Sequence, residues 1–169
     1  SYQRGYRWSS KEVIELLNDI SNFTPRLVND ATDEKTWYCL QPIVIKEIDN
    51  NKFEVIDGQQ RLTTIYLILY YLNQDFVEKK RDKLFQLDYQ TRSDSKKFLN
   101  QLEEDTDRKS NVDFFYISNA YKAINDWFEE KGNKFDTGEF RSKFKFNSKV
   151  IWYLSNEADS ISIFTRINI

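Results

Sequence analysis

The sequence predicts an α+β fold, in which a small β-sheet and a central buried helix are followed by a mainly helical part. The stretch from Phe53 to Leu72 reads FEVIDGQQRLTTIYLILYYL, which is a short apolar run, a tight turn and a long apolar segment. This succession is typical of a strand, a turn and a helix. Two further stretches, one near the start and one after residue 110, space their apolar residues as amphipathic helices do.

Length and composition favour one globular domain. The chain has 169 residues, of which 40% are hydrophobic, 31% charged and 16% aromatic, enough for a core rich in large rings. We find no apolar run long enough to span a bilayer and no signal-peptide pattern, so we expect a cytoplasmic protein without a membrane partner. Because methionine is absent, we expect a fragment of a longer protein.

The residue inventory excludes several kinds of chemistry. Cys39 is the single cysteine and there is no histidine, which excludes an internal disulfide, a Cys/His zinc site and catalysis by a Ser-His-Asp triad. Any metal would therefore be a hard ion on carboxylates, such as Mg²⁺ beside a phosphate. The net charge of −2 gives the chain as a whole no electrostatic reason to bind nucleic acid, although it leaves a local basic patch open.

A helix from about Ser10 to Ser21 is the first expected element. Ser9 and Glu12 have the spacing of a capping box, and apolar residues follow at helical spacing. The aromatic and arginine-rich arm before this helix is interpreted as a segment that seals the core. Aromatic residues more often pack in a core than stack on a nucleobase. We therefore assign the following residues to the core: Tyr2, Tyr6, Trp8, Trp37, Trp152 and Tyr153.

A hairpin is expected next. The β-branched run from Trp37 to Ile48 predicts a strand, and Pro42 within it indicates a strand start or an edge position because proline cannot donate to a ladder. A turn at residues 49–51 leads into a second strand from Lys52 to Ile56, which leaves Asp57 at the end of that strand.

The rest of the chain is expected to be mainly helical around a central buried helix that follows Arg61. The charged runs at 78–83 and 103–109 are interpreted as solvated faces. The other elements are expected in this order: a strand at Leu84–Tyr89, a capped helix to about Glu104, a loop to Asn111, a helix at Asp113–Lys131 ended by Gly132, a buried strand at Lys149–Ser155 and a helix at Glu157–Asn168.

The turn at Asp57 and Gly58 has the chemistry of a phosphate site. Backbone N–H groups in the first turn of a helix lack intrahelical partners, and the helix dipole makes that end attractive to anions. Gly58 permits close backbone approach, Arg61 matches phosphate oxygens, and Asp57 is suited to capping the helix or holding a metal. The alternative is a plain hairpin-to-helix turn in which Arg61 pairs with a nearby carboxylate.

Three stretches, YQRGYRW, VIDGQQRLTT and IFTRIN, occur in this order. Together they resemble the N-terminal domain of GmrSD-type (type IV) restriction enzymes. The middle stretch also resembles the ParB/sulfiredoxin-like fold, which binds a nucleotide at a strand-to-helix turn. The resemblance covers nearly the whole chain and implies one domain over residues 1–169, with a motif-bearing core at 1–72 and a mainly helical extension at 73–169.

The resemblance also implies a site. Asp57, Gln60 and Arg61 match its catalytic positions, and Asp57 would also hold the metal. Its nucleotide-binding positions are matched by Gly58, Gln59, Gln3, Arg4, Arg166 and Asn168. The implied ligands are a nucleoside triphosphate of unassigned base and Mg²⁺. We therefore expect the three stretches to converge on one pocket, although Arg166 would also suit the last turn of a helix.

The function that the resemblance implies is that of a phage-defence restriction system. The domain would bind and hydrolyse the nucleotide and couple hydrolysis to DNA cleavage by a downstream nuclease domain or subunit. Phosphoryl transfer needs mainly positioning and charge neutralisation, which these residue types supply without histidine. Two alternatives remain: a module that binds DNA or a protein partner without turnover, and a domain that nicks DNA directly with a metal at the DGQQR motif.

Overall fold

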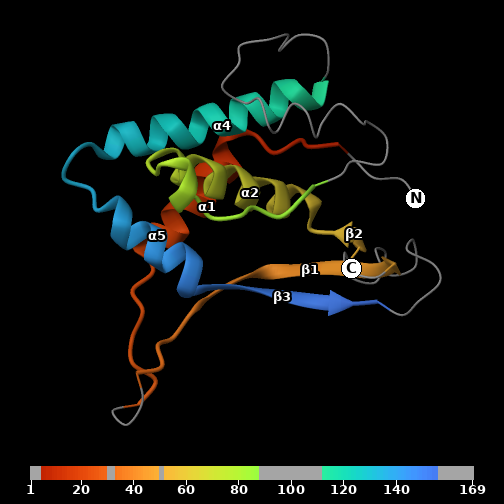
Figure 1. Ribbon diagram of the computed structural model, residues 1–169, viewed down its shortest axis with the longest axis horizontal. Coiled ribbons are helices and arrows are strands. Elements are labelled where there is room, and N and C mark those ends of the chain that lie inside the picture. The colour runs from red at the N-terminus through yellow and green to blue at the C-terminus, as the bar shows by residue number, and fades with distance from the viewer. Residues whose placement is uncertain (1–4, 30–32, 50–51, 88–111, 156–169) are drawn as a thin grey trace.

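The computed structural model describes residues 5–29, 33–49, 52–87 and 112–155. It has an α+β fold, in which the helices lie on one side of a small mixed sheet (Figure 1). The elements in chain order are α1 (Ser10–Asn22), β1 (Tyr38–Asp49), β2 (Lys52–Asp57), α2 (Gln59–Gln74), the short 3₁₀ helix η1 (Glu78–Lys80), α4 (Val112–Lys131), α5 (Thr137–Phe146) and β3 (Ser148–Leu154). The expected α+β class is confirmed.

The helix boundaries follow the local capping signals. The Ser9 hydroxyl accepts a hydrogen bond from the first turn of α1, and the Glu12 carboxylate accepts one from the backbone N–H of Ser9, which confirms the capping box. The hydrogen bond from Ser9 lowers the pKa of Glu12. The helix predicted at 113–131 is confirmed as α4, and Gly132 follows it at φ 66°. Helix α5 was not predicted, although Asp136 caps it and Phe140 and Phe144 share its buried face.

The sheet has the order β2-β1-β3, with β2 antiparallel and β3 parallel to the central strand. The hairpin of β1 and β2 is therefore confirmed, but the position predicted for Pro42 is wrong. Pro42 lies inside the central strand, where the register with β3 shifts between Leu40 and Ile43. Because pairing with β2 begins only at Val44, the missing N–H of Pro42 interrupts neither ladder.

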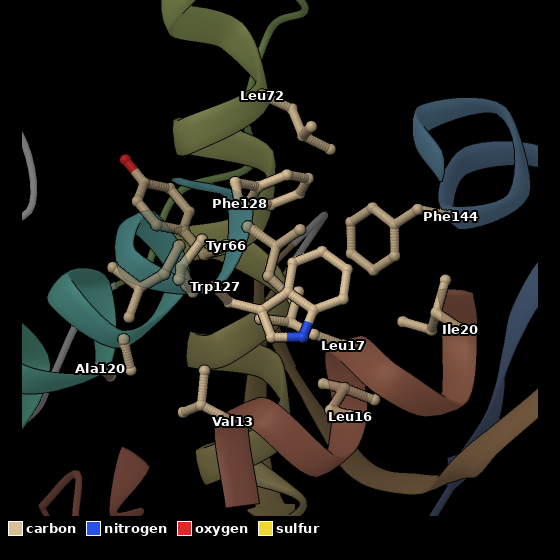
Figure 2. Close-up of a cluster of buried hydrophobic side chains, with 14 of the residues drawn as sticks. Val13, Leu16, Leu17, Ile20, Tyr66, Leu72, Ala120, Trp127, Phe128 and Phe144 are labelled. Carbon is tan, nitrogen blue, oxygen red and sulfur yellow. The ribbon is translucent and has the colours of Figure 1, made fainter. Parts of the chain in front are cut away.

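Helices α1, α2, α4 and α5 enclose the main core (Figure 2). Leu17 and Ile20 of α1 and Leu67 of α2 are fully buried there, and Trp127 of α4 belongs to the same cluster. The expected buried central helix is confirmed as α2. A smaller cluster, formed by Ile43, Ile45 and Leu62, joins the sheet to the first turns of α2. The strand-to-helix turn therefore rests on packed apolar side chains.

Two strand predictions need correction. Residues 84–87 form no strand; Phe85 instead packs edge-on against Tyr66 at 5.6 Å between ring centroids. The alternation of apolar residues in this segment therefore reflects its packing against helix α2. Strand β3 exists, but it is an edge strand and most of it is exposed.

The core assignment of the aromatic residues is correct only in part. Tyr6 is buried, and Trp8 packs against the main core. Trp152 and Tyr153 are 56% and 57% exposed because β3 forms the sheet edge, and Trp37 is 40% exposed just before β1. Tyr2 and the elements expected at 91–104, 103–111 and 157–168 lie outside the described residues. Within the described part of the chain, no helix is long and apolar enough to cross a membrane.

Candidate anion site at the strand-to-helix junction

Gly58 forms the sharp corner between β2 and α2. It has the left-handed φ of 89° and stands at the N-cap of α2, where no side chain caps the helix. A Cβ added here would lie 3.0 Å from Cγ1 and 3.2 Å from Cα of Ile43. Glycine is therefore required both by the backbone conformation and by the close approach of β1. The corner presents the first backbone N–H groups of α2 without a side-chain acceptor.

The two glutamines of the motif hold neighbouring segments. The Gln59 side-chain amide donates to the carbonyl of Val55 on β2 at 2.9 Å. The Gln60 amide donates to the Gly5 carbonyl at 2.9 Å, and its oxygen accepts from the backbone N–H groups of Arg7 at 2.6 Å and Trp8 at 3.2 Å. Both side chains thus bind backbone atoms of other segments, and Gln60 fixes the N-terminal arm.

Arg61 reaches from the first turn of α2 to β1. Its guanidinium donates to the carbonyls of Pro42 at 3.0 Å and Gln41 at 3.4 Å, and to the side-chain oxygen of Gln41. Within the described part of the chain, no ion pair engages Arg61, so its pairing with a nearby carboxylate stays a prediction. Partial burial lowers the pKa of Arg61, and the charge of Asp57 opposes that shift. An arginine remains charged at neutral pH.

Asp57 ends β2, opposite Val44 of β1. Its side chain is partly exposed, and among the described residues no hydrogen bond or ion pair engages the carboxylate. The junction therefore combines an uncapped helix start, a guanidinium without a carboxylate partner and an unengaged carboxylate. This donor set fits a phosphate group accompanied by a hard cation. Across the described ranges, no group of three or more acidic or cysteine side chains gathers to hold a metal by itself.

The N-terminal arm is fixed against α2 and α4. The Tyr6 hydroxyl lies 2.9 Å from Oγ1 of Thr64, and both residues are buried. Arg7 forms an ion pair with Asp113, whose side chain is only 3% exposed. A Cβ at Gly5 would overlap this carboxylate, so glycine lets the arm approach α4. Thr64 and Asp113 are not among the predicted site residues, and neither has a local signal in the sequence because each partner is more than 50 residues distant.

The structure therefore brings two of the three expected stretches together. Gly5 to Trp8 of the arm contact Gln60 and Thr64 of α2, beside Asp57, Gly58 and Arg61. Gln3 and Arg4, which directly precede this arm, lie outside the described residues, as do Arg166 and Asn168 of the third stretch. The convergence of the first two stretches is confirmed, and that of the third stays a prediction.

The fold and the junction define a small α+β domain whose N-terminal arm supports a strand-to-helix corner. A family model described as the GmrSD restriction endonuclease N-terminal domain matches residues 1–169. The chain belongs to this family, and so it is a domain of a restriction system. No curated protein matches the chain.

Proposed function

We propose that the junction binds the phosphate groups of a nucleoside triphosphate together with Mg²⁺. The observation that carries the proposal is the Arg61 guanidinium, which has no ion pair among the described residues, beside the uncapped start of α2. The Asp57 carboxylate, to which the described residues donate no hydrogen bond, lies next to both. A half-buried cation and free helix N–H groups gain most from a multiply charged anion. Asp57 supplies the carboxylate that a phosphate-bound Mg²⁺ requires.

Each residue has a role in this proposal. Arg61 and the N–H groups after Gly58 hold phosphate oxygens, and Asp57 orients the metal or a water molecule. Gln60 acts by holding Gly5 and Arg7 of the arm in place. Gln3 and Arg4, which precede Gly5 in the sequence, would add polar contacts to the nucleotide. Arg166 and Asn168 would complete the pocket from the third stretch. Bound Mg²⁺ would neutralise phosphate charge, which is the principal requirement of phosphoryl transfer.

In the whole protein, we propose that hydrolysis of the nucleotide licenses DNA cleavage by a separate nuclease domain or subunit. This proposal is supported by the family to which the chain belongs, the N-terminal domain of the GmrSD restriction endonuclease. Within the described residues, the junction supplies only one carboxylate, whereas direct cleavage of DNA by metal ions usually employs several. A role in controlling another domain therefore fits the junction better than direct nicking.

A second candidate function is binding without turnover. It is favoured by the hydrogen bonds of Gln59, Gln60 and Arg61, which all end on the chain's own backbone or on Gln41. A motif whose side chains make these hydrogen bonds could have a purely structural role in a domain that binds DNA or another subunit. This candidate predicts DNA or partner binding that is insensitive to substitution of Gln60 and Arg61, and no release of phosphate.

The first test is thermal stabilisation of the purified chain by ATP, GTP, CTP and UTP, each with Mg²⁺. A ligand at 100 times its Kd that binds only the folded state should raise Tm by roughly 5–10 °C for a domain of this size. Asp57→Asn should remove the Mg²⁺-dependent part of the shift, and Arg61→Lys should reduce the shift because the planar fork is lost. Phosphate release should fall in both variants.

The matched controls are Asp126→Asn on α4 and Lys134→Gln in the loop after α4. Asp126→Asn makes the same charge change as Asp57→Asn, and Lys134→Gln removes one positive charge. Both lie at the other end of the helical layer (Figure 1) and should leave the nucleotide shift unchanged. If no nucleotide raises the Tm of the wild-type chain, the proposal is wrong. It is also wrong if Asp57→Asn and Arg61→Lys bind and hydrolyse nucleotide as the wild type does.

A further inference from the structure

A group of cations lies at the opposite end of α2 from the junction. Lys79, Lys80, Arg81 and Lys83 follow one another in and after η1, and all are exposed. Helix α2 has 16 residues, so about 24 Å separates its two ends. We call these residues, with Arg141 and Lys145 of α5, the η1/α5 surface. It shares no residue with the junction.

The segment that carries these cations is held in a fixed conformation. Asn73 of α2 is 5% exposed, and its side chain donates to the Asp82 carbonyl at 2.9 Å and accepts from the Asp82 N–H at 3.1 Å. Arg81 donates to the Phe76 carbonyl at 3.0 Å. A buried amide that satisfies both backbone groups of Asp82 orders the segment before any ligand arrives, which lowers the entropic cost of binding.

Asp82 also joins the segment to α5. Its carboxylate accepts from Lys145 at 2.8 Å and forms an ion pair with Arg141, whose guanidinium lies 4.1 Å from the Phe76 ring centroid. The hydrogen bond from Lys145 lowers the pKa of Asp82, so its charge persists near neutral pH. One carboxylate thus brings cations from two elements onto one surface.

The charge of this surface differs in sign from that of the rest of the chain. It has six basic residues, and the acidic residues within it are Glu78 and Asp82. The remainder of the chain then has 19 basic and 25 acidic residues out of the totals of 25 and 27. Among the described residues, no ion pair engages Lys79, Lys80 or Lys83. These lysines therefore present positive charge to solvent without an ion-pair partner in the described part of the chain.

A cleft of about 420 Å³ opens beside these cations. Arg81 and Asp82 form one part of its lining, and the rings of Tyr66, Tyr70 and Phe85 form another. Phe85 is 38% exposed. Aromatic rings in a cleft next to exposed cations are the arrangement that receives a base beside its phosphates in proteins that bind single strands.

We infer that the η1/α5 surface binds a nucleic-acid strand, with its phosphates on Lys79, Lys80, Arg81 and Lys83 and one unpaired base in the aromatic cleft. The exposed lysines favour any polyanion, whereas the aromatic lining favours a nucleobase over an acidic peptide. This inference extends the restriction function by assigning a nucleic-acid contact to this domain. It does not depend on nucleotide binding at the junction.

The test is fluorescence anisotropy of the 169-residue chain with a labelled single-stranded oligonucleotide across a range of salt concentrations. The triple variant Lys79→Gln/Lys80→Gln/Lys83→Gln should bind at least ten-fold more weakly at 0.1 M salt. Its slope of log K against log salt should decrease by about 2, since each single-strand phosphate contact contributes about 0.7. The nucleotide-induced Tm shift should remain, which separates this result from a failure at the junction.

The matched control is Lys11→Gln/Lys122→Gln/Lys134→Gln, which removes the same charge from exposed lysines elsewhere. It should change affinity less than two-fold. Equal losses in both triple variants would mean that only net charge matters and would overturn the inference. An unchanged affinity in the first variant would do the same, and so would competition by polyglutamate as effective as that by the unlabelled oligonucleotide.

A second variant tests the cleft. Phe85→Leu keeps an apolar side chain but removes the ring, so it should weaken single-strand binding about five-fold or more while leaving duplex binding unchanged. Its Tm, compared with that of the wild type, shows whether the chain still folds. A folded Phe85→Leu variant with unchanged single-strand affinity would overturn the assignment of a base to the cleft.

Discussion

Gly58 is constrained twice, by its own backbone and by a neighbouring strand. Its positive φ strains any residue with a Cβ, and Cγ1 of Ile43 leaves no room for that atom. Gly132 also has a positive φ, but nothing lies within 4 Å of a Cβ added there. Substitution of the two glycines therefore distinguishes the cost of a positive φ, which both have, from the cost of steric overlap, which only Gly58 has.

We expect Gly132→Ala to lower the free energy of unfolding by about 1 kcal/mol, the cost of a left-handed residue. Gly58→Ala should cost roughly 2–4 kcal/mol because β1 must also move. Urea denaturation of both variants measures the difference. Equal losses would show that the approach of Ile43 is relieved without cost.

At the scale of single residues, the sequence identifies the motif but not the direction of its side chains. It predicts correctly that Asp57, Gly58 and Arg61 share one corner. The partners of Gln60 and Arg61 were beyond prediction, because backbone atoms carry no sequence signal and lie about 20 to 55 residues distant.

At the scale of elements, the arm and α4 are joined by a partly buried ion pair. The side chains of Arg7 and Asp113 are 43% and 3% exposed. Lys122 and Asp126, one turn apart on α4, form a pair that is 69% and 44% exposed. Burial should make the first pair much more strongly coupled than the second.

We expect Arg7→Leu to destabilise the chain by about 3 kcal/mol, since it removes the ion pair between Arg7 and a carboxylate that is buried. Adding Asp113→Asn to this variant should recover part of the loss. A double-mutant cycle should give a coupling of roughly 1–3 kcal/mol for this pair, against about 0.3–0.5 for Lys122 and Asp126. Similar couplings in the two cycles would mean that the arm is not held by charge.

The errors in predicting elements have a common cause. Periodicity shows which residues are apolar, but not what covers them. Strand β3 was expected to be buried because it is apolar, yet it lies at the sheet edge. The segment 84–87 alternates like a strand because α2 lies against one side of it. Pro42 is tolerated in the central strand by a register shift that no local pattern announces.

At the scale of the whole molecule, the main core joins the two parts into which the sequence was divided, 1–72 and 73–169. Tyr6 and Leu17 of the first part share one cluster with Phe128 and Phe140 of the second. The α+β class was predictable because α1, α2 and α4 have strong helical patterns. Helix packing was not predictable, since it depends on contacts between segments more than 100 residues apart.

This shared core predicts a single unfolding transition. Phe140 is 2% exposed, with its ring 5.2 Å from that of Phe128, so Phe140→Ala should cost about 3–5 kcal/mol. Tryptophan fluorescence and far-UV circular dichroism should report the same, lower midpoint. Phe146→Ala, at a position that is 69% exposed on the same helix, should change stability by less than about 0.5 kcal/mol. Two separate transitions would show that the two parts fold independently.

The first turn of α2 also determines how this sequence can diverge. Gln59 holds β2, Gln60 holds the arm and Arg61 holds β1. The fold therefore requires most residues of the motif, whether or not a ligand binds there. If the proposed ligand were lost, Gly58, Gln60 and Arg61 would still be retained for folding. Asp57 would change first, because its side chain forms no such hydrogen bond with the described residues. Asp57 is thus the position at which natural variation would distinguish working copies of this site from inherited architecture.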